Sequence, residues 1–487
     1  MITLLLILFP LVASALVMFS GRDSNVRRNA LIASLAEFFL SLASLFGFQN
    51  TGIPEHSFSF PWITNLGISF HFAMDGLSLL LVLLTTFLIP VIILASSGCK
   101  SKRLNIFFGL ILIMEASFIG VFTAQDGFIF YIFWELALIP AYFITALWGG
   151  ADRIKITFKF FIYTLTGSLL MLAALIYLYF QTPNPHSSEF TELFKVGISG
   201  NAQILVFLAF FIAFAIKIPI IPFHTWQPDT YTTAPAAGSM ILAGIMLKMG
   251  IYGLIRLLLP ICYPLMSEIA VPLIGIVIAG LIYASIIAFR QEDLKRFTAY
   301  VSIAHVGLIS AGVLSLNEIA LNGAVFQMIA HGINIVGLFI VIEIIESKFG
   351  IRYMNNLGGI SRVLPSLSIF LMILVLGSVA LPLTNGFIGE FMILLGLFQV
   401  KPLLALFAGT TIIFGVVYML RMFQKVMYGS LPENLKSRNV KMFKEETAAL
   451  IPLVILVILM GCYPKPFLDL AGPSIKTIQD LVLTIPK

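Results

Sequence analysis

The stretch "LAFFIAFAIKIPIIPFHTWQPDTYTTAP", residues 208–235, decides the fold. It begins as an apolar run typical of a membrane helix, yet it contains Lys217 and then Pro219 and Pro222. A proline inside a helix removes one backbone hydrogen bond and clashes with the carbonyl four residues earlier. In lipid, backbone groups freed in this way are tolerated only where protein or water satisfies them. The stretch therefore predicts a membrane helix that breaks beside a buried lysine.

Composition places the whole chain in the membrane. Of its 487 residues 59% are hydrophobic and 11% charged, and the mean hydropathy is +1.03. Apolar runs long enough to cross a hydrocarbon core of about 30 Å recur from end to end. We predict an all-α polytopic membrane protein with about fourteen transmembrane helices, and we exclude a soluble enzyme. The predicted spans lie near residues 2–20, 29–48, 76–96, 105–123, 127–148, 157–180, 201–225, 235–259, 268–288, 297–316, 322–346, 367–397, 403–427 and 446–465.

The basic residues divide between two sets of loops. Of the 29 lysines and arginines, 21 fall in one alternate set of connections. They are Arg22, Arg27, Arg28, Lys100, Lys102, Arg103, Arg153, Lys155, Lys159, Arg290, Lys295, Arg296, Lys348, Arg352, Arg362, Arg421, Lys425, Lys436, Arg438, Lys441 and Lys444. By the positive-inside rule this set is cytoplasmic, and an even number of spans places both termini on the outer face. The net charge of +6 thus reports topology, and we expect no nucleic-acid partner.

Other motifs with known chemistry are missing from the sequence. Its three cysteines, Cys99, Cys262 and Cys462, form no CxxC pair, so the sequence predicts neither a disulfide framework nor a thiolate metal site. It contains no phosphate-binding loop and no segment large enough for a nucleotide domain. The first span lacks the basic start and cleavage site of a removable signal peptide. We therefore expect no cofactor in this chain.

Two interrupted spans indicate an internal repeat. The interruptions lie in residues 215–226 and 377–391, and Pro219 and Pro382 are 163 positions apart. Many transporters consist of inverted halves with breaks at matching positions. We predict N-terminal helices at 1–104, a first five-helix unit at 105–259, a second at 260–430 and a C-terminal transmembrane helix at 431–487. Because five is odd, the second unit enters the membrane from the opposite side. The alternative for each break is a simple proline kink.

Ionisable residues within the predicted spans are the candidate functional groups. A charge at mid-bilayer costs at least ~2.5–3.5 kcal/mol, so such residues are candidates by default. They are Glu115, Glu135, Lys217, Lys248, His305, His331 and Glu390. Carboxyl, amine and imidazole groups at one depth can relay protons, since burial and neighbouring charges change their proton affinity. Structural salt bridges and satisfied core histidines are the alternatives. We interpret Glu37 as peripheral, Glu343 as interfacial, and His224 as a cap or an entry residue.

Five stretches of the chain are similar to a known family. They are "MDGLSLLLVLLTTFLIP" (74–90), "FWELALIPAYFITALWGG" (133–150), "FAIKIPIIPFHTWQPDTYTTAPAAGSMILAGIMLKMGIYGLIR" (214–256), "RQEDLKRFTAYVSIAHVG" (290–307) and "GFIGEF" (386–391). Together they resemble the antiporter-like subunits of proton-pumping NADH:quinone oxidoreductase, respiratory complex I. Relatives of that family are subunits of multi-component Na⁺/H⁺ antiporters. The resemblance covers about residues 70–430, and its 214–256 block is highly specific.

The resemblance implies a role for each matching residue. Glu135 would modulate Lys217, the pumping lysine of the first broken helix. Lys248 would connect to the second half, His305 and His331 would continue the axis, and Glu390 would be its terminal site. Glutamate at the end of "GF-x-G-x" is similar to the subunit M branch, whereas the L and N branches and the antiporters usually carry lysine there.

One departure from the family concerns the loop after the first broken helix. Many members have a histidine shortly after "PD", whereas this chain has Thr230 and Tyr231. A role for a histidine in that loop is therefore not expected here.

The resemblance also implies the setting of the chain. NADH, FMN, iron–sulfur clusters and quinone would lie in partner subunits of a bacterial cytoplasmic (inner) membrane complex. Sister antiporter-like chains would flank this one on both sides. Two alternatives stay open: a subunit of a Na⁺/H⁺ antiporter, and a membrane oxidoreductase whose haem is ligated by His305 and His331.

Overall fold

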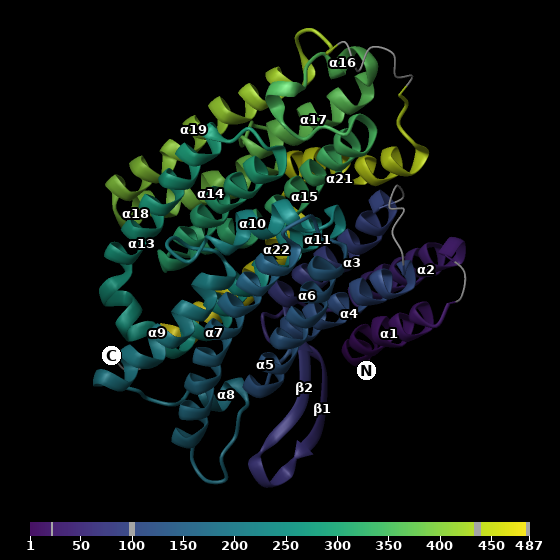
Figure 1. Ribbon diagram of the computed structural model, residues 1–487. Helices are drawn as coiled ribbons and strands as arrows, with labels where there is room; N and C mark the ends of the chain where they lie inside the picture. The colour runs from purple at the N-terminus through teal and green to yellow at the C-terminus, as the bar shows by residue number, and fades with distance from the viewer. Residues whose placement is uncertain (21–22, 97–102, 433–439, 484–487) are drawn as a thin grey trace.

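The computed structural model describes residues 1–20, 23–96, 103–432 and 440–483 of the chain. These residues form a helical bundle with one β-hairpin projecting from one end (Figure 1). The helices are α1 (Ile2–Met18), α2 (Asp23–Ala43), α3 (Gly76–Ala95), α4 (Leu104–Thr123), α5 (Gly127–Leu136), α6 (Leu138–Trp148), α7 (Arg153–Gln181), α8 (Phe190–Leu193), α9 (Gly200–Lys217), α10 (Trp226–Thr233), α11 (Ala236–Ile241), α12 (Leu247–Gly253), α13 (Leu259–Arg290), α14 (Leu294–Leu314), α15 (Glu318–Phe349), α16 (Ile360–Val363), α17 (Pro365–Ser378), α18 (Asn385–Val400), α19 (Pro402–Met427), α21 (Lys444–Cys462) and α22 (Lys465–Leu483).

Within the described residues, the fourteen predicted spans all correspond to helices. Ten stretches are long and apolar enough to cross a membrane, and the longest of them, Ala236–Arg290, holds two predicted spans. These two meet at Cys262, whose φ of −115° and ψ of 19° are not helical. The helices α1 and α2 and the pair α17–α18 supply the three remaining spans. The prediction of an all-α polytopic membrane protein is confirmed.

The two ends of the bundle differ in structure and charge. At the end we call the hairpin face, strands β1 (Glu55–Ile63) and β2 (Ile68–Met74) pair antiparallel. Met1 lies beside this hairpin, because the Thr3 hydroxyl donates to the His56 carbonyl, 2.6 Å away. The opposite end, which we call the basic face, holds the ion pairs of Lys159, Arg296 and Arg352.

Both ends of the described chain lie on the hairpin side. Leu481, near the end of α22, lines one pocket together with Lys195 and Gly197 of the α8 region. An even number of crossings requires this arrangement. The predicted basic residues Arg22, Lys100, Lys102, Lys436 and Arg438 lie outside the described residues, as does Cys99.

The order of the helices follows the predicted repeat. The fourth helix of each proposed five-helix unit is the interrupted one: α9–α10 in the first unit and α17–α18 in the second. The first helix of the first unit, α4, runs toward the hairpin face. The first helix of the second unit, α13, runs toward the basic face and ends there at Arg290. Arg421 binds the Phe289 carbonyl at this end. The two units therefore begin in opposite directions. The exact domain boundaries stay predictions.

The centre of the bundle is formed by α14 and α15. In the apolar window of α14 every residue is buried, and in that of α15 94% are. Polar side chains on these two helices therefore face other helices and cannot face lipid. His305 and His331 lie on them.

Two elements were not predicted from the sequence. The polar connection at 49–75 forms the β-hairpin, and the C-terminal region contains α22 after the predicted last span. The apolar residues Ala471, Ile475, Ile478 and Val482 of α22 recur at intervals of three and four and are buried. This periodicity is typical of an amphipathic surface helix, which a search for long apolar runs misses. Its contacts are with α3, α13 and α15.

Candidate functional site

The first break is stabilised by a tryptophan beyond it. The helix α9 ends at Lys217, and Pro219 has no N–H to donate to the Ala215 carbonyl. The N–H of Ile220 bonds this carbonyl instead, at 2.8 Å. The next carbonyl, of Ile216, accepts a hydrogen bond from Nε1 of Trp226, at 2.9 Å. The side chain of Trp226 thus satisfies a backbone group that the break leaves open, which is why the break is stable in a buried position.

Lys217 lies at this break in a nearly dry pocket. Its side chain is 2% exposed, and its ammonium lies 5.0 Å from the centroid of the Trp134 ring. Glu135 follows Trp134 in the chain and is half-buried. Its polar neighbours are Ser168 and Lys217. Among the described ion pairs none joins Glu135 to Lys217 within 4.0 Å. The acid therefore acts on the lysine through space, without a fixed salt bridge.

The placement of Glu135 follows from the start of its helix. Asp126 is the N-cap of α5, and its carboxylate accepts hydrogen bonds from the N–H groups of Phe128 and Ile129. Glu135 lies nine residues further on, in the last turn of α5. This rigid start fixes the depth of Glu135 in the bundle.

Lys248 lies on a helix with irregular winding. The turns before and after α12 are π-helical: η3 (Leu242–Met246) and η4 (Leu254–Leu258). Such turns leave carbonyls free and are frequent at functional sites. The Lys248 ammonium donates to the Ala243 carbonyl at 2.8 Å and lies 2.9 Å from Nδ1 of His331. Nε2 of His331 in turn lies 3.2 Å from the Ser302 hydroxyl.

The second break positions Glu390. The helix α17 ends at Ser378, and α18 begins at Asn385, five residues before Glu390. Oε1 of Glu390 lies 3.1 Å from Nδ1 of His305 and accepts a hydrogen bond from Nε2 of Gln327 at 3.2 Å. Gly389 allows this approach, since a Cβ there would come within 3.0 Å of the Gln327 Cα. The glycine of "GFIGEF" therefore lets α18 pack closely on α15.

Five of the seven predicted residues form one buried row between the breaks. The rings of His305 and His331 have centroids 6.0 Å apart, so the Lys248–His331 pair and the His305–Glu390 pair are neighbours. Lys217 packs against the same helix as Lys248, because a Cβ on Gly250 would lie 3.3 Å from that of Lys217. The row consists of Lys217, Lys248, His331, His305 and Glu390, with Glu135 beside its first member.

Glu115 lies apart from this row. It is fully buried on α4, and among the described residues neither of its carboxyl oxygens has a hydrogen-bond partner. Its titratable neighbour is Glu37. The interpretation of Glu37 as peripheral is wrong, since Glu37 is 0% exposed. Its apolar neighbours in "IASLAEFFL" suggested a lipid-facing position, but the helix turns the carboxyl inward.

Sequence reasoning also missed several polar partners. Ser302 lies three residues before His305, and Gln327 lies four before His331, so each is on the same helix face as a predicted histidine. That spacing is the signal that could have identified them. Both histidine rings bind protein side chains, so this arrangement gives no support to the haem alternative.

A buried ion pair on the hairpin face explains the "MDG" stretch. Asp75 caps α3 by accepting from the Ser78 N–H at 2.9 Å. Its other oxygen accepts from Nη2 of Arg256 at 2.6 Å, and both side chains are nearly inaccessible to solvent. Tyr252 and Ser78 complete the set around the guanidinium. This pair joins α3 to the helix that carries Lys248.

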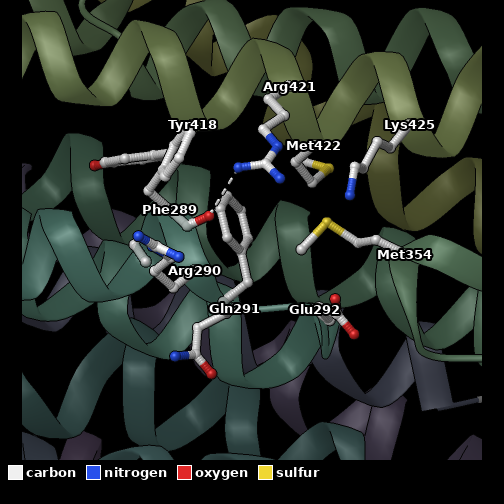
Figure 2. Close-up of a pocket in the computed structure, with 11 residues that line it drawn as sticks. Phe289, Arg290, Gln291, Glu292, Met354, Tyr418, Arg421, Met422 and Lys425 are labelled. Carbon is white, nitrogen blue, oxygen red and sulfur yellow. Dashed lines mark hydrogen bonds between the residues drawn. The ribbon is translucent and has the colours of Figure 1, made fainter.

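On the basic face, the "PD" motif forms a junction between the predicted units. Asp229 binds Lys159 of α7 at 2.9 Å and Arg296 of α14 at 3.0 Å. A pocket of about 200 Å³ opens nearby between the end of α13 and α19. Figure 2 shows Arg290, Arg421 and Lys425 around it, with Arg421 bonded to the Phe289 carbonyl.

Tyr418 leads from this pocket toward the row. It lines the pocket, and Glu390 and Ser285 are its polar neighbours. The phenol is buried.

Comparison with known proteins identifies the class. Residues 124–415 match the family model described as "NADH:quinone oxidoreductase/Mrp antiporter, TM". A chain of respiratory complex I from Thermus thermophilus with bound NADH superposes with a TM-score of 0.91 at 28% identity, covering 99% of this chain and 100% of that one. A chain of the Mrp complex from Dietzia sp. DQ12-45-1b shares the fold, with a TM-score of 0.86 at 18% identity over 99% of both chains. Fold and site together define an antiporter-like membrane subunit.

Curated relatives narrow the assignment. NADH-quinone oxidoreductase subunit M of Rickettsia conorii is 38% identical over 453 residues, 92% of this chain and 91% of that protein. Subunit M of Escherichia coli strain K12 is 39% identical over 446 residues, 88% of this chain and 87% of that protein. The chain therefore belongs to the NADH:quinone oxidoreductase/Mrp antiporter family and, within it, to the subunit M branch.

Proposed function

We propose that this chain is a proton-translocating membrane subunit of an NADH:quinone oxidoreductase, and that its protons move along the buried row from Lys217 to Glu390. The main support is the contact of Lys248 with His331 and of His305 with Glu390, with the two rings 6.0 Å apart. Amine, imidazole and carboxyl groups exchange protons in ordinary chemistry. Water would complete the two steps that no direct hydrogen bond spans, from Lys217 to Lys248 and between the two histidine rings.

The row can work as a relay because the protonation of one member changes the charge that its neighbour experiences. A proton on Lys248 favours a neutral His331 that accepts through Nδ1, whereas loss of that proton lets the imidazole take one up. Nδ1 of His305 lies 3.1 Å from Oε1 of Glu390, close enough for a proton to pass between them. A change of charge at one end therefore changes proton affinity along the row. Glu135 adjusts Lys217 in the same way, since no fixed salt bridge holds the two together.

Membership in the family supports a proposal for the remaining partners and the setting. NADH, FMN, iron–sulfur clusters and quinone belong to other subunits, so this chain carries no redox centre. Sister antiporter-like chains flank it. The membrane is the bacterial cytoplasmic membrane, with the basic face inside and the hairpin face, with both termini, outside.

The test uses the whole complex reconstituted in vesicles. Lys217→Ala removes the first ammonium of the row, and Glu135→Gln removes only the charge beside it. Each should lower NADH-driven proton pumping at least about tenfold, equivalent to ~1.4 kcal/mol on the barrier, while the assembled complex stays present. Lys195→Ala is the matched control, because Lys195 is an exposed hairpin-face lysine paired with Glu192. Wild-type pumping in the Lys217 variant would overturn the assignment.

A second measurement on the same vesicles tests the alternative of a Na⁺/H⁺ antiporter subunit. A sodium gradient is applied to the same vesicles without NADH, and the internal pH is measured. We expect no pH change beyond that of empty vesicles. A sodium-driven change that Lys217→Ala abolishes would instead favour a Na⁺/H⁺ antiporter subunit.

A further inference from the structure

The first four helices contain an isolated pair of acids. Among the described residues of α1, α3 and α4, and of α2 beyond Arg28, the only titratable side chains are Glu37 and Glu115. The two lie on the packed helices α2 and α4, and the charge of one acts on the other. Neither belongs to the row of lysines and histidines described above.

Both acids are dry and lack partners. Each is 0% exposed, and all four carboxyl oxygens lack a hydrogen-bond partner in the described residues. Burying an unpaired carboxylate is so costly that the group instead takes up a proton. Two neighbouring carboxylates repel each other, which adds to this cost. Among the ion pairs of the described residues, none involves Glu37 or Glu115.

A polar stripe on α2 connects this pair to the hairpin face. Ser34, Glu37, Ser41 and Ser44 follow at intervals of three and four, so they share one helix face, and all are fully buried. The Ser41 hydroxyl lies 2.7 Å from that of Thr86, and the Ser44 hydroxyl donates to the Ser41 carbonyl at 2.6 Å.

The stripe ends at a half-buried histidine of the hairpin. Nε2 of His56 lies 3.0 Å from the Ser44 carbonyl, and the exposed tip of the hairpin begins beyond it. Toward the basic face, the buried positions after Ser34 are the apolar Ala30 and Val26. Beyond Ser34 the polar stripe therefore stops toward the basic face, whereas it continues toward the hairpin face.

We propose that Glu37 and Glu115 form a proton-binding site, separate from the row, that exchanges protons with the hairpin face along Ser41, Ser44 and His56. Each exchange breaks one carboxyl O–H bond and forms one on a transient water or a hydroxyl, which releases its own proton to the next group, so no oxidant or reductant is needed. The Ser41 and Ser44 carbonyls only accept hydrogen bonds, so water carries the proton past them. At neutral pH each of the two acids holds one proton. A protein with this site carries a store of protons beside the translocating row.

The first experiment measures the infrared C=O stretch of protonated carboxyl groups in the purified complex. Glu37→Gln and Glu115→Gln each remove one acid without changing side-chain shape. We expect each to remove part of the protonated-carboxyl absorption at neutral pH, and the double variant to remove more. Glu318→Gln, at an exposed acid on α15, is the control and should leave this absorption unchanged.

The second experiment follows the isotope shift of the same absorption after transfer into D₂O. Ser41→Ala interrupts the proposed route, and Ser34→Ala alters an equally buried serine on the other side of Glu37. We expect exchange to slow at least about tenfold in Ser41→Ala, or ~1.4 kcal/mol on the barrier, and to be unchanged in Ser34→Ala.

Two results would overturn the proposal. If neither glutamine variant alters the protonated-carboxyl absorption, the acids are ionised and hold no proton. If Ser34→Ala slows exchange while Ser41→Ala does not, the route leads to the other face. Because the two glutamine variants are independent, poor assembly of one leaves the other decisive. Neither readout requires NADH oxidation, so the outcome is separate from that of the pumping test.

Discussion

The ion pair of Asp75 and Arg256 allows a quantitative test of the packing on the hairpin face. Asp75 is 1% exposed and Arg256 8%, and 2.6 Å separates the bonded atoms. Removing one partner of such a buried pair costs about 3–5 kcal/mol, because the other charge stays buried and uncompensated. Asp75→Ala also removes the cap of α3, which adds ~1 kcal/mol. We therefore expect Asp75→Ala to cost about 4–6 kcal/mol and Arg256→Met about 3–5 kcal/mol.

The double variant Asp75→Ala/Arg256→Met distinguishes this reasoning from simple loss of contacts. With both charges gone, the remaining costs are the cap and some packing, so we expect it to be more stable than either single variant. The measurement is thermal unfolding of the purified complex in detergent, with assembly checked by the amount of this chain in the membrane. Glu192→Ala, which breaks the exposed pair with Lys195, should cost ~0–1 kcal/mol. A double variant as unstable as the sum of the singles would refute the coupling.

Three further predictions concern the breaks, the row and the hairpin. Trp226→Phe removes the indole N–H that satisfies a carbonyl at the first break, which should cost about 1–3 kcal/mol in thermal unfolding, whereas Trp62→Phe at an exposed site should be neutral. His331→Phe removes the imidazole that contacts both Lys248 and Ser302, and NADH-driven pumping should fall at least about tenfold. Retention of pumping in this variant would contradict the prediction. The pKa of His71 on β2 is raised above its ordinary value of 6.5, first by its hydrogen bond to Glu189, 2.8 Å away. The stability from this contact is therefore fully present below pH 6.5 and is lost as the pH rises through the raised pKa. Amide exchange in β2 should accelerate over that range, and Glu189→Gln should flatten the profile.

The sequence was sufficient to predict the spans and the breaks, because both depend on local chemistry. Lipid requires long apolar runs, and a proline within such a run interrupts hydrogen bonding wherever it occurs. Lys217 and Glu390 could be identified for the same reason, since a charge in an apolar run is rare.

Side-chain direction could not be predicted in this way. Glu115 and Glu135 were both predicted as candidate relay residues, yet they face different partners. The direction of a side chain depends on how each helix is rotated against its neighbours, and α2 carries both lipid-facing apolar residues and the buried face with Glu37. The hairpin and α22 were missed because alternating and amphipathic patterns are weak against a strongly apolar background.

The junction at Asp229 constrains how the protein can move. One carboxylate binds a lysine from the first unit and an arginine from the second, and each contact is close to 3 Å. Many secondary transporters work by tilting one half against the other, which opens the binding site to each side in turn. In this chain such tilting would pull Arg296 of the second unit away from Asp229 of the first. Proton conduction by rotating side chains and transient water chains leaves the Asp229 contacts intact. The backbone can then stay nearly still while protons pass through the protein.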